Sequence, residues 1–291
     1  MEVEKAPLIL MSHGLGSIHE EYESLAEELV SFGFVVAGVN HTYCSTASMY
    51  LSGSPEYALA DVDQHAYDDE PKIMKKYERQ WSEDLRFVLT ELQRLNQDQD
   101  SRLFGKLDMN RVGAIGHSFG GAASVAAAQR DERILCAADL DGLLWEIGLN
   151  APPSKPVMLF ETSLIEFKMS NYPLKPSVEF LQSGNLTLDE YHRFRRYKMR
   201  QLSALNRITE AGGVMVKYPG ADHLAFSDYT LIGGVSAGKV DAQRAHFVIN
   251  TYVRAFLDEH LRGTSSDLLR NPSLDFPEIN VVLTEGQHPS N

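Results

Sequence analysis

Cysteine is scarce in this chain: its 291 residues include two cysteines, Cys44 and Cys136. Two thiols cannot form the disulfide framework of a small secreted domain, although a single bond between them stays open. The first fourteen residues carry Glu2 and Glu4 where a signal peptide has basic residues. We therefore expect a cytoplasmic protein with free thiols.

Basic residues are in the minority, with 27 Lys and Arg against 40 Asp and Glu, and the formal net charge is -13. A protein that binds DNA or RNA needs a cationic surface to release counterions from the phosphates, so nucleic acid is excluded as a partner. The longest apolar runs, such as residues 34–39, are far shorter than the roughly 20 residues of a membrane-spanning helix. No transmembrane segment is predicted.

The remaining composition is that of an ordinary globular protein, with 43% hydrophobic and 23% charged residues. It excludes a disordered chain, a collagen-like repeat and a coiled coil. Short apolar runs predict buried strands at residues 7–11, 34–39, 111–115, 134–140, 156–160 and 213–218. Amphipathic or alanine-rich stretches predict helices at residues 20–31, 78–95, 118–130 and 241–261. Because strands and helices alternate, we expect an α/β fold with a mostly parallel sheet covered on both faces.

The chain divides into a core and two additional segments. The α/β core takes up residues 1–163 and 208–263, with a turn at residues 108–110 and a long excursion without clear periodicity at residues 42–71. Residues 164–207 have helical periodicity but no strand, and we interpret them as a helical cap insertion. The tail, residues 264–291, is expected to wrap the surface or to be poorly ordered.

The strongest chemical motif is Gly116-His117-Ser118-Phe119-Gly120, which matches G-x-S-x-G between a predicted strand and a predicted helix. The turn between them is so sharp that small residues must flank the serine, and the serine hydroxyl then points out above the sheet. Its backbone N–H groups lie at a helix N-terminus, which favours an oxyanion. Ser118 is therefore the candidate nucleophile.

A serine hydroxyl needs a base, which a carboxylate in turn must orient. His223 is the best-placed histidine, since it follows the last predicted strand of the core and precedes the last helix. Its acid partner is Asp141 or Glu161, which follow the first and the second strand after the nucleophile strand. Strands lie about 4.8 Å apart, so both acids are within reach and geometry alone leaves the choice open. Asp139 lies deeper in its strand and is the weaker candidate.

The other histidines are interpreted as structural. His117 should point away from the Ser118 hydroxyl, and His13 should shape the first loop. That loop also supplies the second oxyanion donor: the backbone N–H of Leu15, between two glycines, complements the N–H of Phe119. No pair of histidines has a credible metal-ligand spacing, and we expect neither a metal nor another cofactor.

The chain resembles the platelet-activating-factor acetylhydrolase family of α/β-hydrolases, with its microbial and fungal relatives. The matching segments are Ser12-His13-Gly14-Leu15-Gly16, Gly116 to Gly121, Asp139-Leu140-Asp141-Gly142 with Trp145, and His223 to Asp228. In that family the acid follows the strand next to the nucleophile strand, which implies Asp141 rather than Glu161. The resemblance also implies that Leu15 and Phe119 are the oxyanion donors. Two differences stand out: the chain opens at the strand leading into the oxyanion loop, and the cap is larger than in phospholipid-cleaving members.

The sequence thus predicts a serine esterase that cleaves a small-molecule ester through an acyl-enzyme, with Ser118, His223 and Asp141 as its triad. One alternative uses the same triad for acyl transfer, cyclisation or another carbonyl reaction on a natural product. A non-catalytic binding protein on a hydrolase scaffold is the third hypothesis, disfavoured because it has no need of all three residues. The basic run from Arg193 to Arg200 in the cap either binds an anionic group or forms a solvated face. Monomer and homodimer both stay open.

Overall fold

The structure is a computed structural model, and it describes residues 5–50, 53–57, 72–147, 149, 151–162, 173–183 and 186–282. Within these residues the centre of the molecule is a seven-stranded sheet with the order β2-β1-β5-β6-β7-β8-β9. Its strands are β1 (Ala6–Ser12), β2 (Val35–Val39), β5 (Leu107–His117), β6 (Ile134–Leu140), β7 (Val157–Thr162), β8 (Val214–Tyr218) and β9 (Asn280–Val282). A separate antiparallel hairpin consists of β3 (Ala47–Met49) and β4 (Pro55–Tyr57).

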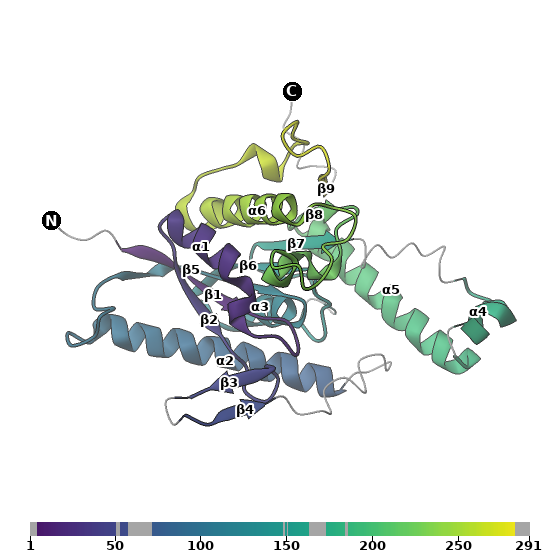
Figure 1. Cartoon of the computed structure of the whole chain (residues 1–291), viewed down its shortest axis with the longest axis horizontal. Coiled ribbons are helices and arrows are strands. Elements are labelled where there is room, and N and C mark those ends of the chain that lie inside the picture. Colours follow the sequence, from purple (N-terminus) through teal and green to yellow (C-terminus); the bar gives the residue numbers. More distant parts are fainter. Residues whose placement is uncertain are drawn as a thin grey trace.

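Helices connect the strands and cover the sheet (Figure 1). They are α1 (Glu23–Ser31), α2 (Lys72–Gln97), α3 (Phe119–Arg130), α4 (Val178–Ser183), α5 (Leu188–Glu210) and α6 (Ala242–Arg262). In the described residues, short 3-10 helices also lie at His19–Tyr22, His223–Phe226, Asp228–Thr230 and Asp267–Leu269. Every neighbouring pair in the sheet is parallel except β8 with β9, as expected where helices link consecutive strands.

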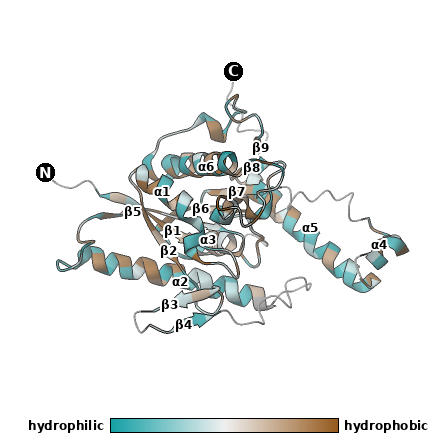
Figure 2. Ribbon diagram, in the orientation of Figure 1, coloured by the Kyte–Doolittle hydropathy of each residue, from teal (hydrophilic) through white to brown (hydrophobic). Residues whose placement is uncertain are grey.

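Two hydrophobic cores lie on opposite faces of the sheet. Because successive strand residues point to opposite faces, Leu8 and Leu10 pack with α2 and α3, whereas Ile9 and Met11 pack with α1 and α6. Figure 2 shows the hydrophobic colour concentrated on the central strands. The prediction of a mostly parallel sheet with helices on both faces is confirmed.

Two local features were not foreseen. The predicted turn at residues 108–110 lies inside β5, where the register slips so that Pro7 pairs with Asp108 but Leu8 pairs with Val112. The Asp108 carboxylate accepts the Asn110 N–H at 2.9 Å, so the residues do form a local turn, but as an irregularity within a strand. The tail adds a strand, because β9 pairs with the free edge of β8.

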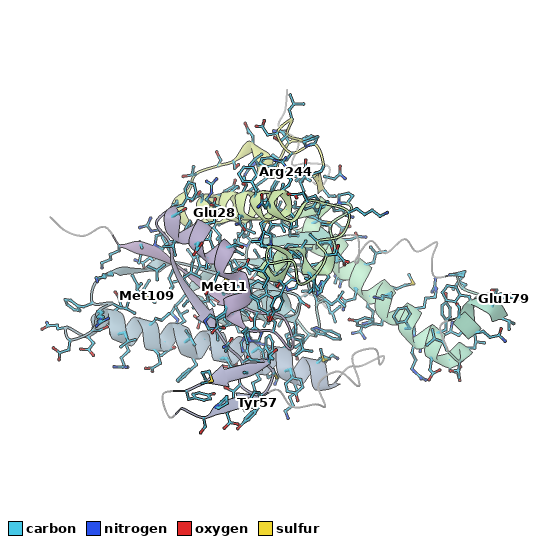
Figure 3. All side chains as sticks on the ribbon, viewed as in Figure 1. Met11, Glu28, Tyr57, Met109, Glu179 and Arg244 are labelled. Atoms are coloured by element: carbon cyan, nitrogen blue, oxygen red, sulfur yellow. The ribbon has the colours of Figure 1, made fainter. Side chains whose placement is uncertain are left out.

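The excursion after β2 also has more structure than expected. It contains the β3–β4 hairpin, on which Tyr57 lies (Figure 3). Helix α2 begins at Lys72 rather than at the expected residue 78. Residues 58–71 lie outside the described part of the chain.

The predicted cap, residues 164–207, is described from residue 173 on, without 184 and 185. Helix α5 leaves the body of the protein and carries α4 at its far end, where Glu179 lies (Figures 1 and 3). Thr187 caps the start of α5 in a reciprocal pair of hydrogen bonds with Glu190. At the other end, Leu205 and Ile208 are buried in the core. We call α4 and α5 together the arm.

No helix in the described ranges is long and apolar enough to cross a membrane. Cys44 and Cys136 are both buried, and neither takes part in a disulfide.

Candidate active site

Ser118 lies at the sharp turn between β5 and α3, with φ 54° and ψ −122°. This left-handed backbone is unusual for a residue with a side chain and indicates a strained turn. It depends on glycine neighbours: a Cβ on Gly116 would collide with the Gly120 carbonyl, and one on Gly120 with the His13 carbonyl. The Ser118 N–H donates to the Leu140 carbonyl of β6 at 2.8 Å. The turn therefore fixes the serine at the carboxyl edge of the sheet.

The structure brings Ser118, His223 and Asp141 together in one hydrogen-bonded row. The Ser118 Oγ lies 3.0 Å from the His223 Nε2, and the His223 Nδ1 lies 2.7 Å from the Asp141 Oδ2. Since a carboxylate oxygen accepts hydrogen bonds, Nδ1 carries the ring proton and Nε2 is free to accept the serine proton. This is the arrangement in which a serine hydroxyl can be activated.

Asp141 is held rigidly in this row. It directly follows β6, and its side chain is completely buried. Thr162, the last residue of β7, donates to it twice: from its N–H to Oδ1 at 2.7 Å and from its hydroxyl to Oδ2 at 2.7 Å. These two hydrogen bonds replace those that an exposed carboxylate would make with water. The part played by Thr162 could not be foreseen, because no motif marks it.

The other two acids have different partners. Glu161 is buried next to Lys217 of β8, with 3.7 Å between the Glu161 Oε2 and the Lys217 Nζ. Asp139 accepts the Gly142 N–H at 2.9 Å beneath the turn, and burial raises its pKa well above the ordinary value. The structure thus places Asp141 against His223 and brings neither Glu161 nor Asp139 to it.

The two expected oxyanion donors belong to segments next to Ser118. Phe119 is the first residue of α3, and Leu15 lies in the loop after β1, which we call the oxyanion loop (residues 13–17). A Cβ on Gly14 would lie 3.5 Å from the Ser118 Cβ, so this loop passes directly beside the serine. Neither the Leu15 N–H nor the Phe119 N–H has a hydrogen-bond partner within the described residues. Both are available to an oxygen bound above Ser118.

A second serine–histidine–aspartate row lies beneath the oxyanion loop. The His41 Nε2 is 2.9 Å from the Ser12 Oγ, and its Nδ1 is 2.8 Å from Asp84. Trp81 stacks on the His41 ring at 3.9 Å between centroids. Ser12 and His41 are completely buried or nearly so, so no substrate can reach this row. His41 is a satisfied core histidine.

His13 fixes one peptide of the oxyanion loop. Its Nε2 accepts the His41 N–H at 3.3 Å, which leaves the proton on Nδ1, and Nδ1 donates to the Gly14 carbonyl at 2.6 Å. Burial lowers the pKa of His13 to about 3, so the ring is neutral. The Gly14 carbonyl belongs to the same peptide as the Leu15 N–H. Holding the carbonyl therefore also sets the direction of that N–H.

An aromatic row leads from the nucleophile turn to the arm. Phe119 contacts Trp145 at 6.2 Å between ring centroids, and Trp145 stacks on Tyr197 of α5 at 5.7 Å. The Gln201 side chain of α5 bonds both the N–H and the carbonyl of Leu144, at 3.1 and 2.6 Å. The base of the arm is thereby attached to the loop that follows Asp141.

Glu78 of α2 holds the same loop from the other side. Its buried carboxylate accepts the N–H groups of Trp145, Glu146 and Ile147 at 3.0 to 3.3 Å.

In the described ranges no group of three or more His, Cys, Asp or Glu side chains is placed to hold a metal ion.

Glu161 makes a testable contribution to stability. Burial raises its pKa from 4.5 to about 7, against the opposing effect of Lys217. The folded chain therefore keeps a proton there that the unfolded chain releases, so this stabilisation is present below pH 4.5 and is lost as the pH rises through 7. The free energy of unfolding of the wild type should therefore fall by about 3 kcal/mol over this pH range. Glu161→Gln does not titrate at this position, so we expect its free energy of unfolding not to show this fall.

The measurement is urea unfolding of both proteins at several pH values from 4.5 to 8. Glu132→Gln is the control, because the Glu132 side chain is 96% exposed. Curves for Glu161→Gln that run parallel to the wild type would contradict the raised pKa.

Comparisons with known proteins identify the family of this chain. The family model described as "Platelet-activating factor acetylhydrolase, isoform II" matches residues 1–268. The platelet-activating factor acetylhydrolase of Cavia porcellus is 28% identical over 281 residues, which cover 89% of this chain and 58% of that protein. A probable 1-alkyl-2-acetylglycerophosphocholine esterase of Arthroderma benhamiae is 26% identical over 289 residues, 94% of this chain and 65% of that protein. The chain thus spans about three fifths of the length of these relatives.

A solved esterase structure is similar over almost the whole chain. It is a ferulic acid esterase from Streptomyces cinnamoneus, 28% identical, with a TM-score of 0.67 over 96% of this chain and 74% of that one. Together with the sheet order, this similarity confirms the α/β-hydrolase fold.

Proposed function

The chain belongs to the platelet-activating factor acetylhydrolase, isoform II, family, and from this premise we propose that it hydrolyses a small-molecule carboxylic ester with Ser118 as nucleophile. The observation that carries the proposal is the row Ser118–His223–Asp141, with hydrogen-bond distances of 3.0 and 2.7 Å. The named activities of the relatives and of the structural neighbour are all ester cleavages.

In the proposed reaction the Ser118 Oγ attacks the ester carbonyl while His223 Nε2 takes up the serine proton. Asp141 holds the imidazole in the required tautomer and stabilises its positive charge. The N–H groups of Leu15 and Phe119 bind the oxygen that becomes negative. His223 then returns the proton to the leaving alcohol, and an acyl-enzyme remains. Water, activated by His223, releases the acid and restores Ser118.

The decisive experiment is a series of nitrophenyl esters of increasing acyl length, run beside a fluorophosphonate probe. We expect the probe to label the chain and at least one ester to show a burst followed by steady turnover. Labelling without turnover would indicate acyl transfer to an acceptor other than water. No labelling would contradict the proposal and favour a binding protein.

We further propose that the arm selects the substrate. Its base contacts the loop after Asp141 through Tyr197 and Gln201, and this loop in turn contacts Phe119. The arm carries exposed apolar side chains, which are Val178, Phe180, Leu188 and Met199. Such side chains can close over a bound substrate.

Replacing residues 164–196 with a short linker tests this role. The design keeps Tyr197 and the buried end of α5, so the fold should survive. We expect the probe to label Ser118 as before, while the ranking of acyl lengths changes and bulky esters are cleaved faster. An unchanged ranking would show that the arm has no part in selecting the substrate.

Charge reversal of Arg195 and Arg196 tests the basic run separately. If the basic run binds an anionic group of the substrate, KM should rise with much less change in kcat. Such a contact is made equally in the ground state and the transition state, so its loss weakens binding without raising the barrier from the bound substrate. Unchanged constants would leave the run as a solvated face.

A further inference from the structure

We infer that Tyr22 and His117 are positioning residues, which hold the oxyanion loop and His223 in fixed places around Ser118. The inference rests on the proposed function and adds to it two residues that do not touch the reacting atoms. Three hydrogen bonds carry it. The Gly14 N–H donates to the Tyr22 Oη at 3.2 Å, the Tyr22 Oη lies 2.8 Å from the His117 Nδ1, and the His117 Nε2 lies 2.9 Å from the His223 carbonyl oxygen.

The direction of each bond follows from the chemistry of its atoms. A backbone carbonyl only accepts, so the His117 Nε2 must carry a proton. Burial and the neighbouring His223 lower the pKa of His117 well below 6.5, so the ring is neutral and its Nδ1 accepts. The Tyr22 hydroxyl therefore donates to Nδ1, and its oxygen accepts the Gly14 N–H. Burial raises the pKa of Tyr22 to about 12, which keeps the hydroxyl protonated.

The chain of bonds joins three segments that are far apart in sequence. Gly14 directly precedes Leu15, His117 directly precedes Ser118, and the carbonyl at the end belongs to His223 itself. Both Tyr22 and His117 are 3% exposed, so water is not at hand to replace either side chain. One tyrosine and one histidine thus connect the proposed oxyanion donor, nucleophile and base.

Packing supports the hydrogen bonds. The His117 ring lies 4.5 Å from the His223 ring and 5.3 Å from the Phe226 ring, between centroids. A Cβ on Gly14 would lie 3.3 Å from both the Tyr22 Oη and the His117 Nδ1. The glycine therefore lets the oxyanion loop approach closely enough for the bond. A small shift of this loop would misdirect the Leu15 N–H, and misplacement by about 1 Å can cost about 100-fold in rate.

Tyr22→Phe is the first test, because it removes one hydroxyl and keeps the ring. With the best ester of the nitrophenyl series we expect kcat to fall about 10- to 100-fold and KM to change less than about threefold. The rate of fluorophosphonate labelling should fall in parallel. Tyr252→Phe is the matched control, since Tyr252 is a buried tyrosine of α6 packed against Phe160 and Phe276. It should keep the wild-type kcat.

Two substitutions of His117 test its two hydrogen bonds separately, the one to Tyr22 and the one to the His223 carbonyl. Gln can place a donor where Nε2 lies but leaves Tyr22 without its acceptor, whereas Asn can do the reverse. If the bonds act as a unit, Tyr22→Phe combined with His117→Gln should lose little more kcat than the worse single variant. A merely structural role predicts lowered melting temperatures with unchanged kcat at 25 °C.

The outcomes distinguish this inference from the proposed function. An active wild type whose Tyr22→Phe variant keeps kcat, or whose double variant loses the full product of the single effects, overturns the positioning role alone. A wild type that neither reacts with the probe nor cleaves any ester overturns both. Loss of kcat in Tyr22→Phe, with the melting temperature still far above the assay temperature, supports the positioning role.

Discussion

Ser118→Ala is expected to abolish fluorophosphonate labelling and to lower kcat by several orders of magnitude. The reason is that the proposed reaction passes through a bond to the Ser118 Oγ, and no other hydroxyl lies against the His223 Nε2 in the described part of the chain. The residual rate should be that which the oxyanion donors and substrate binding supply on their own.

The variant should fold normally. Alanine meets the same positive φ of 54° that serine already adopts, and among the described residues the Ser118 side chain loses the hydrogen bond to His223. Ser124→Ala is the matched control: Ser124 lies in the same helix, α3, and its hydroxyl donates to the Gly120 carbonyl at 2.8 Å. Ser124→Ala should keep its activity and its labelling. More than about a tenth of the wild-type turnover in Ser118→Ala would exclude Ser118 as the nucleophile.

The sequence predicted the central strands of the sheet well, because β1, β6 and β7 are buried on both faces and appear as apolar runs. Strand β9 could not be predicted in this way. It has three residues, two of them exposed, and exists because the edge of β8 offers unpaired backbone groups. The β3–β4 hairpin was missed for a similar reason, since its strands of three residues are too short for a periodic pattern.

The residues of the candidate site differ in how far sequence could find them. Ser118 has a local motif, and His223 has a typical place after a strand, so both could be named. The partners that hold them could not. Thr162 and Tyr22 act through contacts with residues 21 and 95 positions away, and such contacts exist only once the sheet has formed. Sequence reasoning can therefore name a nucleophile more readily than the groups that orient it.

The choice between the two acids shows the same limit. From the sequence, Asp141 and Glu161 were both within reach of a histidine on a loop. The structure distinguishes them by direction: Asp141 leaves the sheet at the end of β6 with φ 61°, which turns its side chain toward His223. Glu161 is still within β7 and pairs with Lys217 in register across β7 and β8.

Asp141→Asn should therefore lower kcat about 10³- to 10⁴-fold. An amide nitrogen can take the place of the Asp141 Oδ2 and donate to the His223 Nδ1. That would put the ring proton on Nε2, and a protonated Nε2 cannot accept the proton of Ser118. Thr162 would still find an oxygen at Oδ1, so most of the local packing should remain. Activity with the ester series and the labelling rate should fall together, with thermal unfolding as the check on folding.

Glu161→Gln is the matched variant, because it makes the same chemical change at a buried acid one strand further along the sheet. We expect it to keep kcat within a few fold, since the Glu161 carboxylate pairs with Lys217 and does not contact His223. The opposite pattern, an active Asp141→Asn and an inactive Glu161→Gln, would assign the acid to Glu161. Equal and large losses in both would show that the pair acts jointly, through the electrostatic influence of Asp141 on the pKa of Glu161. If only Asp141→Asn loses kcat, the acid acts by holding His223 in the tautomer that carries its proton on Nδ1.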